Sequence, residues 1–270
     1  KRGRLRGFGL GNIIEQTSQA FGETVQVRFD PSGTVTVVAG SISHGQGHET
    51  MYKILLSDRL GIAPESIRLA RNDTDVTTDG GGTFASRTAV LGGSAASIAC
   101  ERIIEKGKRV AAHLMEAAAA DIEFRDGRYL VKGTDRGISM SEIIVRHRKP
   151  GVAHPLDTIA ENPAARTFPT GAHACEIEID AETGEAEVLC YTAVDDVGRV
   201  INHTMAEGQI HGGVMQSAGH VFGEQCLYDP ETGQLLSGSF VDYIMPRADL
   251  VQDFRVLDHS VPSPNNVLGA

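Results

Sequence analysis

The chain has 270 residues, of which 41% are hydrophobic and 5% aromatic, and its formal net charge is −10. This length allows one large domain or two modest ones with an aliphatic core. The charge argues against a nucleic-acid partner, and the sequence shows no apolar run of about 18 residues and no signal segment. We therefore expect a cytoplasmic protein with no membrane span. Its four widely separated cysteines predict free thiols in a reducing compartment.

The first half of the chain alternates strand and helix patterns. Residues 1–6 form a short basic cluster that we expect to be solvated. The alternating residues 24–29 and 34–39, joined by Asp-Pro-Ser-Gly, predict a β-hairpin. Residues 51–60 then predict a helix, and residues 89–120, rich in Ala, Ile and Val, predict a long helix with small residues that permit close packing.

The patterns that follow are shorter. Residues 121–131 predict a hairpin around Asp126-Gly127, and 139–146 predict a short helix with a capping box formed by Ser139 and Glu142. We expect residues 147–169 to be a connecting loop. A further hairpin is predicted from 174–179 and 185–191, around a turn at 180–184.

The two main hairpins share a context that indicates a weak internal repeat. Each is followed by a glycine-rich segment and then by a helix pattern. We therefore expect two related halves, residues 1–165 and 166–270, with one loop facing a ligand in each half. A pseudo-twofold arrangement would bring both loops to one site.

The first glycine-rich segment, Gly45-Gln-Gly-His-Glu-Thr50, lies between a strand and a helix. Its glycines let peptide N–H groups approach an anion, the helix start adds a positive dipole end, and Gln46 and His48 add donors. It is neither G-x-G-x-x-G nor a P-loop. Taken alone, it fits a plain tight turn about as well as a ligand loop. His44 and His48 lack the H-E-x-x-H context of a zinc pair.

Two more segments have the same character. Residues 78–88 contain three consecutive glycines before Thr83, Ser86 and Arg87. Residues 195–202 and 207–216 form the other segment, in which Asp195 and Asp196 should point to opposite faces of a strand and serve as a turn and a loop anchor. Turns alone do not require polar side chains to be clustered in this way in three separate segments.

Taken together, these segments resemble the large, molybdopterin-binding subunit of the xanthine dehydrogenase family, the molybdenum hydroxylases that include carbon monoxide dehydrogenase and aldehyde oxidoreductases. The resemblance covers nearly the whole chain. It is carried by Gly45–Thr50, by Ser86-Arg87, and by 196–202 with Gly208-Gln209 and Gly212-Gly213 after it. It implies an α+β fold, a molybdenum cofactor-binding domain with two related hairpin, glycine-loop and helix halves.

The resemblance also implies roles for individual residues. Gln46 would hydrogen-bond near the molybdenum centre, the loops around His48 and Arg87 would hold the pterin and its phosphate or nucleotide tail, and Asn202 and Gln216 would complete the wall. The cofactor-binding residues implied in this way are Gly45, Gln46, Gly47, His48, Thr83, Ser86, Arg87, Asp196, Gly198, Asn202 and Gln216, with no protein ligand to a metal. The sequence departs from the family pattern at Val197, His203 and Ser217.

The family's catalytic glutamate belongs to a Gly-Val-Gly-Glu stretch that would follow Ala270. We therefore expect the general base to lie outside this sequence, and the N-terminal half of the same subunit to precede it. Both ends of the sequence read as cuts. On this view the second half, 166–270, stops before the catalytic segment, and the isolated chain is inactive.

The implied function is oxidation of an aldehyde, an N-heterocycle or carbon monoxide, with water as the oxygen source. The cofactor would be molybdenum–molybdopterin in a dinucleotide form, with iron–sulfur clusters and FAD only on partner subunits of an oligomer. One alternative is a non-catalytic, small-anion-binding or degenerate scaffold domain. Another is a hydrolase using Asp196 with a histidine, but this requires a G-x-S-x-G turn, which the sequence lacks.

Overall fold

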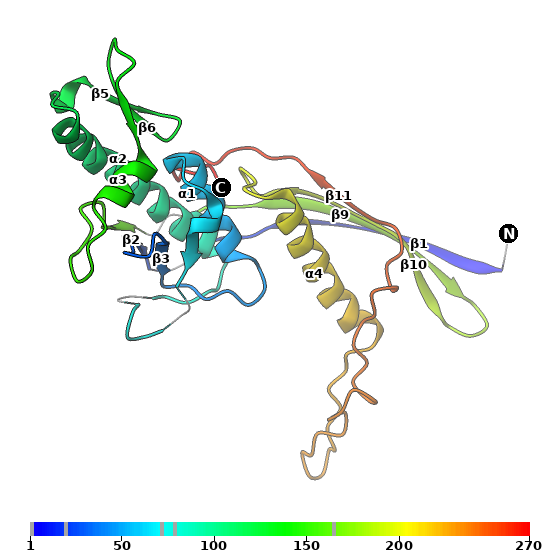
Figure 1. Cartoon of the computed structure of the whole chain (residues 1–270). Helices are drawn as coiled ribbons and strands as arrows, with labels where there is room; N and C mark the ends of the chain where they lie inside the picture. Colours follow the sequence, from blue (N-terminus) through cyan, green and yellow to red (C-terminus); the bar gives the residue numbers. More distant parts are fainter. Residues whose placement is uncertain (1–2, 19–20, 71–72, 78–79, 164–165) are drawn as a thin grey trace. The chain divides into compact units, whose positions relative to one another are not determined.

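The computed structural model describes residues 3–18, 21–70, 73–77, 80–163 and 166–270 (Figure 1). Two compact units form: unit 1 comprises residues 1–15 and 169–261, and unit 2 comprises residues 16–168 and 262–270. These units do not correspond to two halves that meet at residue 165. The start of the chain joins unit 1, and residues 262–270 join unit 2. The start of the second glycine-rich segment, Thr78 and Asp79, and the expected boundary at residue 165 lie outside the described residues.

Unit 2 is built on a four-stranded sheet with the order β4-β3-β2-β8. Strands β2 (Glu23–Phe29) and β3 (Val35–Ala39) form the predicted hairpin, and β4 (Ile67–Leu69) runs parallel to β3. Side chains of β2 alternate between buried and half-buried positions, whereas all five residues of β3 are buried. This difference shows that β3 lies inside the unit.

Two helices pack with this sheet. Helix α1 (His48–Leu60) follows the hairpin and leads through the 3-10 turn η1 (Pro64–Ser66) to β4. Helix α2 (Ser94–Leu114) follows a π-helical turn η2 (Thr88–Gly93). The predicted long helix is confirmed over most of its length but ends at Leu114, because the backbone turns into the left-handed region at Glu116, with φ 49°.

The predicted hairpin and short helix after α2 are confirmed. A 3-10 turn η3 (Ala119–Asp121) leads into β5 (Ile122–Arg125), which pairs with β6 (Arg128–Val131), and β6 pairs with β7 (Gly137–Ser139). Helix α3 (Met140–Arg146) begins at the predicted capping box, in which the Ser139 hydroxyl accepts from the Glu142 backbone and the Glu142 carboxylate accepts from the Ser139 N–H at 2.8 Å.

The prediction that residues 147–169 form only a connecting loop is wrong, because they contain β8 (Thr158–Asn162). This strand pairs antiparallel with β2 and completes the sheet of unit 2. Its pattern is alternating, with Thr158 and Ala160 buried and Ile159 and Glu161 exposed. A five-residue strand of this composition gives a weak local signal, so its partner on the sheet decides its structure.

Unit 1 is also a four-stranded sheet, with the order β1-β9-β10-β11. Its strands are β1 (Arg4–Ile14), β9 (Thr170–Asp180), β10 (Ala186–Asp196) and β11 (Phe254–Asp258). Of the basic start, which we expected to be solvated, Arg4 and Arg6 lie at the beginning of β1, and both side chains are exposed. Arg4 pairs with Glu187 of β10 at 2.9 Å and Arg6 with Glu176 of β9 at 2.5 Å, so these charges bind other strands of the same sheet.

The internal repeat predicted from the sequence appears in the connectivity of both sheets. In each unit a hairpin (β2-β3 or β9-β10) leads through a glycine-rich loop to a helix, α1 or α4 (His203–Phe222), and then to a parallel strand, β4 or β11. An antiparallel strand from elsewhere in the chain, β8 or β1, borders the first hairpin strand. The halves therefore share strand order and direction.

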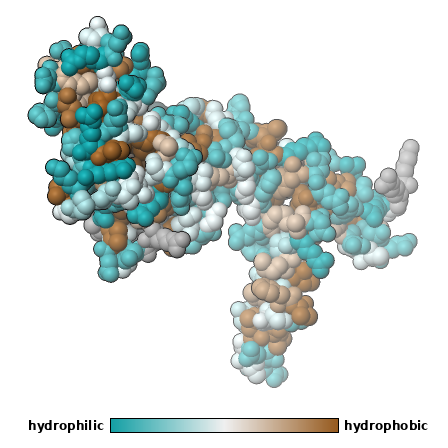
Figure 2. Space-filling view, in the orientation of Figure 1, coloured by the Kyte–Doolittle hydropathy of each residue, from teal (hydrophilic) through white to brown (hydrophobic). Residues whose placement is uncertain are grey.

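The segment 223–253 of unit 1 has little regular structure and exposes many apolar side chains (Figure 2). Among them are Leu227, Tyr228, Leu236, Phe240, Val241, Ile244 and Met245.

In the described part of the chain, no helix is both long enough and apolar enough to cross a membrane.

Unit 2 contains a buried histidine whose protonation should couple to its stability. His154 is 4% exposed, its Nδ1 accepts from the Leu156 N–H at 3.2 Å, and its Nε2 faces the Ile144 carbonyl at 3.3 Å. This pattern requires a neutral ring with the proton on Nε2. Burial is the main cause that lowers the pKa of His154 below 6.5, against the opposing charge of Asp157.

We expect unit 2 to lose stability as the pH falls below about 6.5, because the unfolded chain then binds a proton that folded His154 excludes. The contribution is fully present above this value. In urea unfolding at several pH values, His154→Gln should flatten the loss between pH 7 and 5. The matched change His113→Gln, at an exposed position of α2, should leave the pH dependence as it is. Equal slopes for wild type and His154→Gln would contradict the assignment.

Candidate functional site

The first glycine-rich loop, residues 40–47, joins the end of β3 to the start of α1. Its backbone needs glycine at two positions, since Gly45 has φ 110° and Gly47 has φ 76°. Gly47 is the N-cap of α1 and provides no side-chain hydrogen bond. The helix therefore begins with first-turn N–H groups that no capping side chain satisfies, which is the geometry that binds anions at helix starts.

Gln46 and His48 place polar atoms at the same helix start. The Gln46 amide oxygen accepts from the His44 N–H, so its NH2 group is the end that can donate to a ligand. His48 is 5% exposed, and its buried Nδ1 has no partner among the described residues. Burial, followed by the charge of His44, lowers the pKa of His48 and favours the neutral ring. A buried ring nitrogen without a hydrogen-bond partner is a group that fits a contact with a bound cofactor.

The second glycine-rich loop lies directly against the first. The Thr83 hydroxyl donates to the Ile42 carbonyl at 2.6 Å, and the Gly82 N–H donates to the Gly40 carbonyl at 3.3 Å. A side chain at Gly80 would come within 2.7 Å of the Gly40 oxygen. Two segments about 40 residues apart in the sequence are therefore held together, which places Thr83 beside Ile42 of the first loop. A shared contact of Gln46, His48 and Thr83 with one ligand stays a prediction.

Backbone strain marks the end of the second loop. Ala85 and Ser86 both adopt left-handed conformations, with φ 47° and 51°, at a cost of about 1 to 3 kcal/mol each. The Ala85 carbonyl accepts from the N–H of Ser18, which is itself left-handed with φ 59°. Ser18, which precedes β2, is thus joined to the second loop. The sequence did not indicate the left-handed conformations of Ser18 and Phe21, because serine and phenylalanine carry no signal for a positive φ.

Arg87 lies in a different environment from the one the sequence implied. Its side chain is fully buried and forms an ion pair with the Glu23 carboxylate at 2.5 Å, although the two groups lack the alignment of a hydrogen bond. It also donates to the carbonyls of Gly82 at 2.9 Å and Gly22 at 2.6 Å. Only its buried Nε has no acceptor among the described residues. A direct contact between this guanidinium and a phosphate does not fit such burial.

The glycine-rich loop of unit 1 is anchored by the carboxylate of Asp196, at the end of β10. Its Oδ1 accepts from the N–H groups of Gly198 and Val261, both at 3.0 Å, and Gly198 has φ 70°. This confirms the loop-anchor interpretation of Asp196. Asn202 is the N-cap of α4, and its side-chain oxygen accepts from the Met205 N–H at 3.0 Å. Both residues therefore shape the loop, and their contacts with a cofactor stay a prediction.

Helix α4 presents an open face built from small residues. A Cβ atom at Gly208, Gly212 or Gly213 would have no other atom within 4 Å, and Gln216 is exposed on the same helix.

On the sheet of unit 1, Asp195 points the other way from Asp196, and its carboxylate accepts from His173 Nε2 at 3.1 Å. This confirms that the two neighbouring aspartates use opposite faces of β10.

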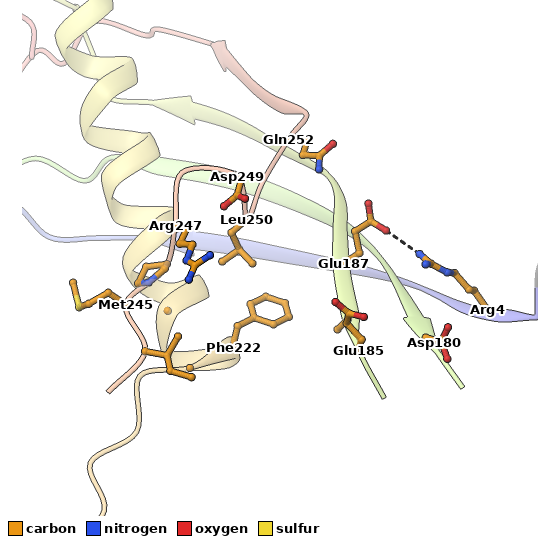
Figure 3. A pocket seen from close by; sticks show the side chains of 15 residues that line it. Arg4, Asp180, Glu185, Glu187, Phe222, Met245, Arg247, Asp249, Leu250 and Gln252 are labelled. Atoms are coloured by element: carbon orange, nitrogen blue, oxygen red, sulfur yellow. Dashed lines mark hydrogen bonds and ion pairs between the residues drawn. The ribbon is translucent and has the colours of Figure 1, made fainter. Parts of the chain in front are cut away.

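Unit 1 also has a groove of about 440 Å³ beside the Arg4–Glu187 ion pair (Figure 3). It is formed by the β9-β10 hairpin, the end of α4 and the segment that contains Arg247 and Asp249. None of the predicted cofactor-binding residues lines it. The groove is therefore separate from the glycine-rich loops.

Residues 1–252 match the family described as "Molybdopterin cofactor-binding domain". The chain belongs to this family. It is 36% identical to a protein of Paenarthrobacter nicotinovorans named "6-hydroxypseudooxynicotine dehydrogenase complex subunit gamma", over 99% of this chain and 34% of that protein. It is 34% identical to the "Carbon monoxide dehydrogenase large chain" of Hydrogenophaga pseudoflava, over 98% of this chain and 33% of that protein.

Solved structures show the same fold. A crystal structure of Cu,Mo-CO dehydrogenase superposes with a TM-score of 0.87 at 30% identity, over 99% of this chain and 36% of that one. Quinoline 2-oxidoreductase from Pseudomonas putida 86 gives 0.86 at 33% identity. The family and the α+β fold predicted from the sequence are thus confirmed. The chain spans about a third of the length of the curated relatives it matches.

Proposed function

We propose that this molybdopterin-binding chain is the cofactor-holding part of the large subunit of a molybdenum hydroxylase, which oxidises an aldehyde, an N-heterocycle or carbon monoxide with oxygen from water. The observation that carries the proposal is the meeting of two glycine-rich loops at the uncapped start of α1, beside the unpartnered Nδ1 of His48. The names of the matched relatives, which include dehydrogenases and hydroxylases, agree with it.

The residues of unit 2 would divide the work of binding. The first-turn N–H groups of α1 and the neutral ring of His48 suit an anionic, hydrogen-bonding tail. The NH2 group of Gln46 would donate close to the metal centre, and the hydroxyl groups of Thr83 and Ser86 line the adjoining loop. The bound cofactor would supply the redox chemistry, while these groups orient it and exclude water.

Three further parts of the proposal concern the whole protein. We place the general base, a carboxylate, beyond Ala270, and we expect an N-terminal part of the same subunit to complete the site. Iron–sulfur and flavin subunits of an oligomer would carry the electrons away. Two matched relatives are named as a complex subunit and as a large subunit, which agrees with such an assembly.

The competing function is a non-catalytic domain that binds a small anion through the same loops. The two functions differ in what co-purifies with the protein. We would express the full-length subunit with its neighbouring genes in a host that makes molybdopterin, and measure molybdenum and pterin by mass spectrometry. About one molybdenum per subunit is expected for a hydroxylase. A protein free of both under these conditions would overturn the proposal.

Removing the Gln46 side-chain amide should weaken cofactor binding without disturbing the fold. We expect Gln46→Ala, made in the full-length subunit, to lower affinity for the cofactor about 10- to 100-fold, the usual effect of losing a supporting hydrogen bond at a metal site. Molybdenum content and thermal unfolding would be measured together. The matched control is Gln234→Ala, in an exposed turn of unit 1. Equal metal content in Gln46→Ala and the control would remove Gln46 from the site.

A further inference from the structure

One buried ion pair connects three backbone segments of unit 2. Glu23 begins β2, is 3% exposed, and accepts the N–H of Gly40 on its Oε1 at 2.9 Å. Its other oxygen pairs with Arg87, which donates to the carbonyls of Gly22 and Gly82. Gly40 and Gly82 are also bonded to each other. The pair therefore ties the start of β2 to Gly40 in the first glycine-rich loop and to Gly82 in the second.

The guanidinium of Arg87 has no room to turn toward a ligand. A Cβ atom at Gly81 would lie 2.9 Å from Arg87 Nη1, so the second loop rests directly on this group. The Phe84 ring covers the guanidinium carbon at 5.5 Å from its centroid. Tyr52, fully buried, lies close enough that burial and the charge of Glu23 raise its pKa. The pair is thus enclosed on several sides.

Enclosure of this kind carries a cost, since two charges must leave water. The loops around the pair explain why the arrangement is useful. Glycines at 40, 45, 47 and 80–82 leave these segments without side chains that could hold their own positions, and free glycine backbones are conformationally permissive. Fixed hydrogen bonds from Glu23 and Arg87 can replace the missing anchors.

We infer that Glu23 and Arg87 are positioning residues, which set the spacing between the two glycine-rich loops, and that Arg87 is not itself an anion ligand. This inference rests on the proposed function, because the loops are taken to hold the molybdopterin. It assigns a role to Glu23, which the sequence patterns did not single out. It also replaces the contact with the phosphate or pterin that the sequence implied for Arg87.

The substitution Glu23→Gln separates the two roles by the direction of its effect. If Arg87 were an anion ligand, removing the competing carboxylate charge would leave cofactor affinity unchanged or increase it. If the pair positions the loops, Glu23→Gln should weaken the affinity of the full-length subunit for the cofactor at least about tenfold. Its molybdenum and pterin content should fall as a result. Arg87→Lys should do the same, because lysine keeps the charge but lacks the fork that reaches two carbonyls.

Hydrogen exchange by mass spectrometry gives a second readout that does not depend on the cofactor. In Glu23→Gln, the amides of residues 40–47 and 80–86 should exchange at least about tenfold faster, while those of the buried strand β3 keep their protection. A general loss of stability would instead raise exchange in β3 as well. The matched control is Glu65→Gln, an exposed carboxylate in η1 of the same unit.

The outcomes are distinct. Wild type without molybdenum would overturn the proposed function, yet faster exchange confined to the two loops in Glu23→Gln would still establish the positioning role. Normal cofactor content together with unchanged loop exchange in Glu23→Gln would overturn the positioning role and leave the proposed function intact. If Glu23→Gln does not fold, Arg87→Lys is judged by the same two measurements.

Discussion

Replacing Arg87 by methionine should lower the free energy of unfolding of unit 2 by about 3 to 5 kcal/mol. The substitution leaves the Glu23 carboxylate buried without its counter-charge, which is the costly way to break a buried pair. It also removes the donors to the Gly22 and Gly82 carbonyls. Denaturant unfolding, followed by hydrogen exchange in β2 and β3, measures the loss in this unit.

The double substitution Glu23→Leu with Arg87→Met tests the electrostatic reason. Removing both charges takes away the buried carboxylate that has lost its ion pair with Arg87, so the double variant should be more stable than Arg87→Met alone. Recovery should be incomplete, because three backbone groups, including the Gly40 N–H, still lack their partners. Additive losses in the two single variants would show that the charges are not coupled.

Replacing Gly107 by alanine should destabilise unit 2 by about 1 to 3 kcal/mol, although alanine is the better helix former. Gly107 lies within α2, and a Cβ atom there would come within 1.8 Å of the Tyr129 hydroxyl oxygen and 2.4 Å of its ring. Tyr129 is fully buried, so its ring cannot move aside cheaply. Urea unfolding of wild type and variant provides the measurement.

The same substitution at Gly212 is the control, because this position on α4 has no atom within 4 Å of a built Cβ. Here only helix propensity acts, and Gly212→Ala should stabilise α4 by about 0.5 to 1 kcal/mol. Hydrogen exchange within each helix separates the two effects. A stabilised Gly107→Ala variant would mean that Tyr129 yields and that α2 packs less tightly than the structure shows.

Elements with a strong local signal could be predicted from the sequence. The hairpin β2-β3 has alternating residues around a Pro-Ser-Gly turn, and α3 has a capping box at Ser139. Strands β1 and β8 could not be predicted in this way. In β1, glycines alternate with larger residues and arginines, and its stability comes from an 11-residue pairing with β9, far away in the sequence.

The two-unit organisation shows the same limit. The repeat of hairpin, glycine-rich loop and helix is local, and the sequence indicated it. The exchange of termini is not local: the start of the chain joins unit 1 through β1, and residues 262–270 join unit 2. Pairings over such distances follow from burial and sheet register, which one sequence does not display.

For the candidate site, the sequence by itself determined the family, the fold class and the glycine-rich loops, because glycine spacing and turn chemistry are properties of short segments. Only the tertiary structure decided what Arg87 does. The sequence could not distinguish an arginine that faces a ligand from one that pairs with a carboxylate 64 residues away in the chain, and Glu23 looked like an ordinary polar residue at a strand end. Burial assigns those roles, since a charge removed from water must find a partner inside the protein.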